Sequence, residues 1–314
     1  MSSSTANSPQ LFHVACLDAY QPLANQATSA QHRVACWQWG SNAAPHVVVC
    51  VHGLTRNARD FDVLAGALVA RSAGDVRVVC IDVAGRGASD WLSDPAGYQV
   101  PFYVADLLAV LAALQQRAPM QRLSWIGTSM GGLIGMVIAG QPALPMPCPI
   151  ERLVLNDVGP EIEWAALARI GTYVGQPVHF DTEAQGAAAL WDASPTFGPH
   201  SSDEWLALSK PMLQPAPQGG WQLHYDPSIA VPLRNLTAES VARGTAGLWQ
   251  LYDQITARTL LTRGAESDLL SSRVARLMTE RGPRARLVEF AGVGHAPTFV
   301  PRDQVDCVVS FVLD

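Results

Sequence analysis

Residues 127–131 read Gly-Thr-Ser-Met-Gly, which places Ser129 between two glycines in the pattern G-x-S-x-G. A short apolar run, 123–126, precedes this segment, and a longer apolar run, 133–139, follows it. A serine on a sharp turn between a buried strand and a helix presents its hydroxyl at the end of a sheet. The glycines suit such a turn because side chains would crowd its strained backbone. The motif therefore predicts that Ser129 is a nucleophile.

A serine hydroxyl needs a general base, and a histidine near the end of the chain fits this role. His295 lies between a strand-like run, 286–290, and a helix-length segment, 301–313. The loop after a parallel strand lies at the carboxyl edge of the sheet, where Ser129 also lies. His295 is therefore the predicted base, in preference to a surface or capping role.

An acidic side chain must orient the base, and three candidates follow strand-like runs. Asp268, after the run 259–262, is the preferred acid on its position, where it completes the chain order Ser, Asp, His. The same residue could instead cap a helix that runs to about residue 281. Asp157, just after the run 152–156, is the alternative acid, and Glu266 is the third candidate.

Fixed N–H groups must bind the oxyanion that forms when a carbonyl carbon is attacked. The backbone N–H of Met130, next to the nucleophile, is one predicted donor, and that of Leu54, after the run 46–51, is the other. Gly53 allows this loop to approach closely, and His52 is predicted to brace it rather than to catalyse. Further along, four charged residues are predicted either to support the loop by ion pairs or to be solvated: Arg56, Arg59, Asp60 and Asp62.

Strand-like runs alternate with helix-length segments along most of the chain, which predicts a mostly parallel sheet with helices on both faces. The first two strand-like runs alternate more in polarity and suit an antiparallel edge. The runs are 12–17, 33–39, 46–51, 76–81, 123–126, 152–156, 259–262 and 286–290. The helical segments are 58–72, 104–116, about 267–281 and 301–313.

Residues 159–254 interrupt this alternation, because they are rich in aromatic residues and proline and contain no strong strand-like run. They are predicted to form a helical cap over the carboxyl edge of the sheet. Residues 1–158 and 255–314 then form the core domain, with 1–10 as a mobile tail. Most aromatic side chains of the cap are predicted to pack within it, and a few to line a pocket.

Composition excludes several classes of function. The 314 residues carry a formal charge of −6 and a single lysine, so no basic patch indicates nucleic-acid or membrane binding. No apolar run is as long as a membrane span, and residues 1–9 lack the features of a secretory signal. The six cysteines show neither a C-x-x-C pair nor metal-ligand spacing, which predicts reduced thiols in the cytoplasm and no metal.

Taken together, these motifs resemble the α/β-hydrolase superfamily over residues 30–313. The matching blocks occur in the family's order and are 52–53, 82–89, 127–132, Asp268 and 294–295. The resemblance implies an α/β-hydrolase fold with an eight-stranded sheet and a helical cap between the sixth and seventh strands. It also implies a triad of Ser129, His295 and Asp268, with no metal or organic cofactor.

The nucleophile narrows the class within this superfamily. Haloalkane dehalogenases and epoxide hydrolases of this fold use aspartate where this chain has Ser129. Residues 54–62 depart from the G-G-G oxyanion loop of the hormone-sensitive-lipase-like branch. The chain is more similar to small cytosolic esterases, lactonases and C–C bond hydrolases of ring-cleavage products.

The expected activity is hydrolysis of a small-molecule carboxylic ester or lactone through an acyl-enzyme, with water as the second substrate. One alternative is cleavage of a C–C bond by the same triad, with Arg169 or Arg234 binding an acidic substrate. The other is a non-catalytic role, because this fold also hosts receptors that bind a small ligand in the same pocket.

Overall fold

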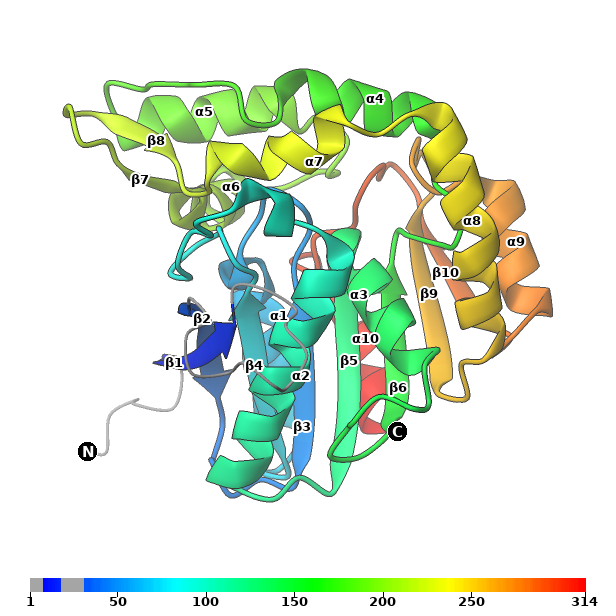
Figure 1. The fold of residues 1–314 in the computed structure, drawn as a ribbon. Helices are drawn as coiled ribbons and strands as arrows, with labels where there is room; N and C mark the ends of the chain where they lie inside the picture. The colour runs from blue at the N-terminus through cyan, green and yellow to red at the C-terminus, as the bar shows by residue number, and fades with distance from the viewer. Residues whose placement is uncertain (1–7, 18–30) are drawn as a thin grey trace, which may run out of the picture.

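The structure is a computed structural model that describes residues 8–17 and 31–314. Its centre is an eight-stranded sheet in the order β1-β2-β4-β3-β5-β6-β9-β10 (Figure 1). The strands are β1 (Gln10–Leu17), β2 (Gln31–Trp39), β3 (His46–Val51), β4 (Val76–Asp82), β5 (Arg122–Thr128), β6 (Ile150–Asn156), β9 (Arg258–Gly264) and β10 (Arg286–Phe290). The pairs β1–β2 and β2–β4 are antiparallel, and the others are parallel, as predicted.

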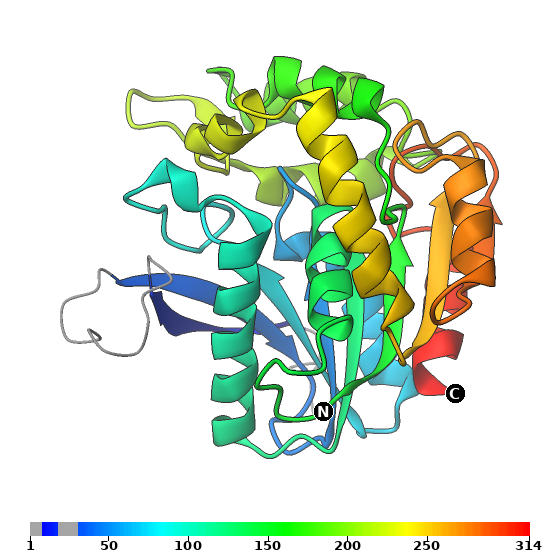
Figure 2. The ribbon, with the colours of Figure 1, turned by 45° about the vertical axis from the view of Figure 1, so that its right-hand side comes forward.

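Helices cover both faces of this sheet (Figures 1 and 2). Their bounds are α1 (Asp62–Arg71), α2 (Val100–Arg117), α3 (Met130–Ala139), α8 (Ala238–Asp253), α9 (Ser272–Glu280) and α10 (Arg302–Leu313). The six residues of strand β3 are all buried, so this strand needs cover on both faces of the sheet. Val47 and Val49 pack in the core that includes α2, α3, α8 and α9, whereas Val48 and Cys50 pack in the core that includes α1 and α10. A strand buried on both faces favours a continuous apolar run over alternation.

The remaining elements form a cap above the carboxyl edge of the parallel strands (Figure 1). They are α4 (Trp164–Tyr173), α5 (Glu183–Ala193), α6 (Ser202–Ser209), β7 (Leu213–Pro215), β8 (Trp221–Leu223) and α7 (Ala230–Arg234). The rings of Trp191 and Trp205 meet edge to face with their centroids 4.8 Å apart. Such pairs show that aromatic side chains of the cap pack against one another.

The predicted insertion 159–254 also includes α8, which runs beside α3 (Figure 2). Tyr252 of α8 is fully buried in the main core, and its hydroxyl donates to the carbonyl of Met278 at 2.6 Å. This part of the predicted insertion therefore covers the sheet rather than the carboxyl edge.

The structure also bears on four narrower expectations. The helix predicted from about residue 267 begins instead at Ser272, with Ser271 as its N-cap, so Asp268 does not cap it. All six cysteines are free thiols. Residues 1–7 of the predicted tail lie outside the described residues, and Gln10 already begins β1. Among the helices described, none combines the length and the apolar character needed to cross a membrane.

Candidate active site

Ser129 occupies a sharp turn between β5 and α3. Its backbone has φ of 51° and ψ of −115°, a conformation that residues with a side chain rarely adopt. A Cβ atom on Gly127 would lie 2.3 Å from the carbonyl oxygen of Gly131, and one on Gly131 would lie 2.0 Å from that of Val51. Both positions therefore require glycine, and the turn is the strained elbow that the motif predicts.

His295, in the loop after β10, lies against this serine. Its Nε2 is 3.0 Å from Ser129 Oγ, and its Nδ1 is 2.7 Å from Asp157 Oδ2. A carboxylate can only accept a hydrogen bond, so the Nδ1 atom carries the proton. Nε2 then has a free lone pair for the hydroxyl proton of Ser129.

The acid beside the histidine is Asp157, not Asp268. Asp157 follows β6 and is fully buried, with a positive φ of 56°. The preferred prediction is wrong in this respect, because the Asp268 carboxylate pairs with the Arg169 guanidinium at 2.6 Å and is 53% exposed. Glu266 is exposed and forms no hydrogen bond with His295 in the part of the chain that the structure describes.

The loop after β9 supplies hydrogen-bond donors to this carboxylate rather than the acid itself. The Gly264 N–H donates to Asp157 Oδ1 at 3.0 Å, and the Ser267 hydroxyl donates to Asp157 Oδ2 at 2.6 Å. The backbone N–H groups of Leu269 and Leu270 donate to Ser267 Oγ at 3.3 and 3.2 Å. A buried carboxylate needs such donors to remain charged. Ser267 was not identified from the sequence, where it is one small polar residue in a loop.

Asn156 is a second residue that the sequence did not indicate. Its side-chain amide donates to Thr128 Oγ1 at 3.0 Å and to the Pro297 carbonyl at 2.8 Å, and it accepts from Thr262 Oγ1 at 2.9 Å. It therefore ties strand β5, which ends just before Ser129, to the loop that carries His295.

The residues that carry the two predicted oxyanion donors lie close to Ser129. A Cβ atom on Gly53 would be 3.7 Å from the Cβ of Ser129, which places the Leu54 loop directly beside the serine. Met130 begins α3, where N–H groups have no partner within the helix. Neither the Leu54 nor the Met130 N–H donates a hydrogen bond to another described residue. Both groups are therefore available to bind an oxyanion.

His52 braces this loop, as predicted. Its Nε2 accepts from the Val83 N–H at 2.9 Å, so its Nδ1 carries a proton and donates to the Gly53 carbonyl at 2.6 Å. That carbonyl belongs to the same peptide as the Leu54 N–H. Complete burial lowers the pKa of His52 to about 3, so the ring stays neutral at neutral pH. The hydrogen bond thus fixes the plane in which the Leu54 N–H points.

We expect His52→Ala to lower both stability and activity. The change leaves the Val83 N–H unsatisfied and opens a cavity, which costs about 2–4 kcal/mol of unfolding free energy. It also frees the Gly53–Leu54 peptide, so kcat falls by about 10-fold or more. Urea denaturation and ester hydrolysis measure the two effects. The control is His13→Ala, whose exposed side chain bonds, among the residues that the structure describes, only to the Ala88 carbonyl. Equal effects of the two changes would contradict the bracing role.

Arg86, from the loop after β4, contacts both residues that carry the predicted oxyanion donors, Leu54 and Met130. It is fully buried, its Nε donates to the Leu54 carbonyl at 2.8 Å, and its Nη2 is 3.8 Å from Met130 Sδ. Asp82 holds the same region, because its carboxylate accepts from the N–H groups of Ala58 and Ala88 at 2.7 and 3.0 Å. Burial raises the pKa of Asp82. The block 82–89 therefore supports the oxyanion loop.

The charged residues after Leu54 form ion pairs rather than a solvated surface: Arg56 with Asp60, and Arg59 with Asp62.

The cap is hydrogen-bonded to the loop after β3, called the oxyanion loop for its predicted role, and to the loop after β10, called the base loop. On the oxyanion loop, Arg56 Nη2 donates to the Leu208 carbonyl at 3.1 Å and Asn57 Nδ2 to the Pro211 carbonyl at 2.7 Å. On the base loop, the Gly294 N–H donates to the Thr196 carbonyl at 2.6 Å. The side chains of His200 and Thr298 also meet there, at 2.8 Å.

One group of described residues outside this site has metal-ligand types. Ligand atoms of Cys16, His32 and Asp106, all buried, lie within 4.8 Å of one another. They come from β1, β2 and α2, at the antiparallel edge of the sheet, and His32 Nε2 is 3.1 Å from Asp106 Oδ2. Because this group lies apart from β5, β6 and β10, it contributes no atom to the candidate active site.

Comparisons with known proteins show the family of this chain. Residues 48–306 match the model of the alpha/beta hydrolase family. The chain is 45% identical to a 3-hydroxybutyrate-oligomer hydrolase from Cupriavidus necator, over 97% of this chain and 98% of that protein. A shorter match, 39% identical over 38% of this chain and 32% of the other, is to a serine hydrolase-like protein from Danio rerio. A crystal structure of an α/β hydrolase from Novosphingobium aromaticivorans has a TM-score of 0.79 and 33% identity, over 98% of this chain and 99% of that one. This chain therefore belongs to the α/β-hydrolase family.

Proposed function

We propose that this protein hydrolyses carboxylic esters through an acyl-enzyme formed on Ser129. The observation that carries the proposal is the continuous line of hydrogen bonds from Asp157 through His295 to Ser129, at 2.7 and 3.0 Å. This arrangement matches the three roles of orienting acid, general base and nucleophile. The free N–H groups of Leu54 and Met130 beside Ser129 match the fourth role, binding of the oxyanion.

Each step has an assigned group. Ser129 Oγ bonds to the carbonyl carbon as its proton passes to His295 Nε2, and the carbonyl oxygen becomes the oxyanion held by the Leu54 and Met130 N–H groups. His295 then protonates the leaving alcohol, and the ester C–O bond breaks. Water attacks the acyl-enzyme, with its proton passing to His295 and then to Ser129 Oγ, which releases the acid. Asp157 stays ionised and stabilises the imidazolium.

The proposed substrates are short oligomers of 3-hydroxybutyrate. Their support is the relative with this printed activity, which is 45% identical over almost the full length of both chains. Cleavage of one internal ester bond consumes one water and gives two shorter hydroxy acids. The mechanism requires no cofactor. The proposal includes the predicted cytoplasmic location, which the six free thiols support.

The test is a substrate panel with the purified protein. We expect the protein to release 3-hydroxybutyrate from its dimer and trimer, with mass spectrometry as the detection method. We also expect it to hydrolyse p-nitrophenyl butyrate. Reaction of Ser129 with a fluorophosphonate probe should add one phosphonyl group to the protein. Cleavage of a ring-fission dienoate without cleavage of any ester would favour the C–C hydrolase alternative. An unreactive Ser129 together with no turnover would favour a ligand-binding role.

A further inference from the structure

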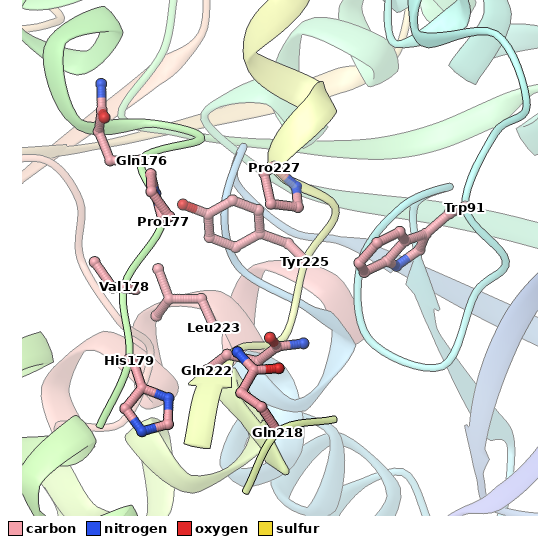
Figure 3. Close-up of a pocket in the computed structure, with 10 residues that line it drawn as sticks. All are labelled: Trp91, Gln176, Pro177, Val178, His179, Gln218, Gln222, Leu223, Tyr225 and Pro227. Atoms are coloured by element: carbon pink, nitrogen blue, oxygen red, sulfur yellow. The ribbon is translucent and has the colours of Figure 1, made fainter. Parts of the chain in front are cut away.

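A cavity of about 310 Å³ lies between the cap and the loop after β4 (Figure 3). We call it the cap cavity. Trp91 comes from the loop after β4, called the core loop, and Val178 comes from the connection between α4 and α5. The other residues used below come from the hairpin β7–β8 and the segment that follows it. These are Gln218, Gln222, Leu223 and Tyr225.

The lining combines apolar walls with unused hydrogen-bond donors. The residues that line the cap cavity include one histidine, His179, and none of them is Asp, Glu, Lys or Arg. Val178 and the Trp91 ring, which is 49% exposed, are among the large apolar groups of the described surface. The Trp91 indole N–H and the side-chain amides of Gln218 and Gln222 form no hydrogen bond to another described residue. The cavity therefore offers N–H donors and apolar contact without a carboxylate, a lysine or an arginine.

This chemistry fits an oligoester of hydroxy acids better than other chain-like ligands. Each repeat unit of 3-hydroxybutyrate has a methyl group and an ester carbonyl, with no charge and no donor inside the chain. Free N–H groups can donate to the carbonyls, and the apolar walls can contact the methyl groups. A plain hydrocarbon chain would leave the N–H groups desolvated and unpaired, and a phosphorylated ligand would meet no lysine or arginine.

The wall of the cavity is joined to the oxyanion loop. The segment that carries Tyr225 pairs with the core loop that carries Arg86, because the Gly87 N–H donates to the His224 carbonyl at 3.1 Å and the Asp226 N–H to the Gly85 carbonyl at 2.8 Å. The Arg86 guanidinium in turn contacts Leu54 and Met130. A single residue, Arg86, thus connects the cavity wall with the residues that flank Ser129.

We propose that the cap cavity is a distal subsite that binds repeat units of the oligoester beyond those held at Ser129. This proposal rests on the proposed function and deepens it, because it makes chain length the property that the enzyme recognises. The units in the cavity contribute binding energy without taking part in bond cleavage.

The test compares chain lengths in Trp91→Ala. We expect kcat/KM for the 3-hydroxybutyrate tetramer to fall by about 10-fold through a higher KM, because an aromatic contact is lost. The values for the dimer and for p-nitrophenyl butyrate should stay within about twofold of the wild type, because the proposal assigns the cavity only to repeat units beyond those held at Ser129. The matched control is Trp164→Ala, a cap tryptophan of similar exposure, 38%, that does not line the cavity.

A second variant separates hydrogen bonding from shape. Gln222→Glu keeps the size of the side chain but replaces the N–H donors by a carboxylate, which repels ester carbonyls. We expect a several-fold higher KM for the tetramer and an unchanged KM for the dimer. The melting temperature of each variant should match that of the wild type.

Three outcomes would contradict the proposals, and they differ. Wild-type kinetics of both variants at every chain length would overturn the subsite alone. Equal losses for tetramer, dimer and p-nitrophenyl butyrate would show that Trp91 acts on the catalytic centre rather than as a subsite. A wild-type protein that cleaves p-nitrophenyl butyrate but no oligomer would overturn the proposed substrate, and the subsite with it.

Discussion

Ser129→Ala is expected to lower kcat for p-nitrophenyl butyrate by about 100,000-fold, because no nucleophile then lies within reach of His295. The change should leave stability nearly unaltered. Alanine keeps the Cβ atom, so it meets the same backbone strain at φ 51° that serine already tolerates, and the hydroxyl bonds to His295 alone among the described residues. The measurement is single-turnover hydrolysis with the melting temperature recorded on the same sample.

A matched control for this variant is Ser124→Ala, in the same strand. Ser124 is fully buried and contacts His46 at 2.8 Å, at the opposite end of β5 from the nucleophile. We expect this variant to lose stability but to keep its fluorophosphonate reaction. A Ser129→Ala protein that turns over esters at even one hundredth of the wild-type rate would rule out Ser129 as the nucleophile.

Asp157→Asn is expected to lower kcat by about 10,000-fold at neutral pH, whereas Asp268→Asn should change it by less than about twofold. An asparagine amide can donate to His295 Nδ1, which would place the ring proton on Nε2 and remove the lone pair that Ser129 needs. Asp268 instead forms an exposed ion pair with Arg169, and such pairs contribute little.

These two variants are compared by kcat over a range of pH, with circular dichroism to confirm that each is folded. In Asp157→Asn the amide oxygen can still accept from the Gly264 N–H, and the amide nitrogen that faces His295 can donate to the Ser267 hydroxyl oxygen, so the loop after β9 has reason to stay in place. If Asp268→Asn were inactive and Asp157→Asn active, the assignment from the geometry would be reversed.

Much of this architecture follows from the sequence because the strands of a parallel sheet carry a strong local signal. In β3 all six residues are buried, and five of the six are Val or Cys. The elbow at Ser129 is equally local, since its two glycines lie within two residues of it. By contrast, the hairpin β7–β8 has only three residues in each strand, and so few residues give no periodicity.

The identity of the acid depends on contacts that no local pattern reports. Both candidates follow a parallel strand, so both lie at the carboxyl edge of the sheet. What separates them is that Asp157 receives donors from Gly264 and Ser267, about 110 residues later in the chain, whereas Asp268 points to the exposed Arg169. The position after the strand-like run 259–262 favoured Asp268, and the three-dimensional arrangement of the loop after β9 favours Asp157.

Hydrogen bonds join the cap to the oxyanion loop and to the base loop, so opening the cap would also disturb the alignment of the predicted donors and base. A movement that lifts the cap as a unit must break the contacts of Leu208 and Pro211 with the oxyanion loop and that of Thr196 with the base loop. An open enzyme would therefore lose the support that aligns its donors and its base. Water that enters before substrate would meet an incompletely assembled centre, and the rate of turnover would report closure as well as bond cleavage.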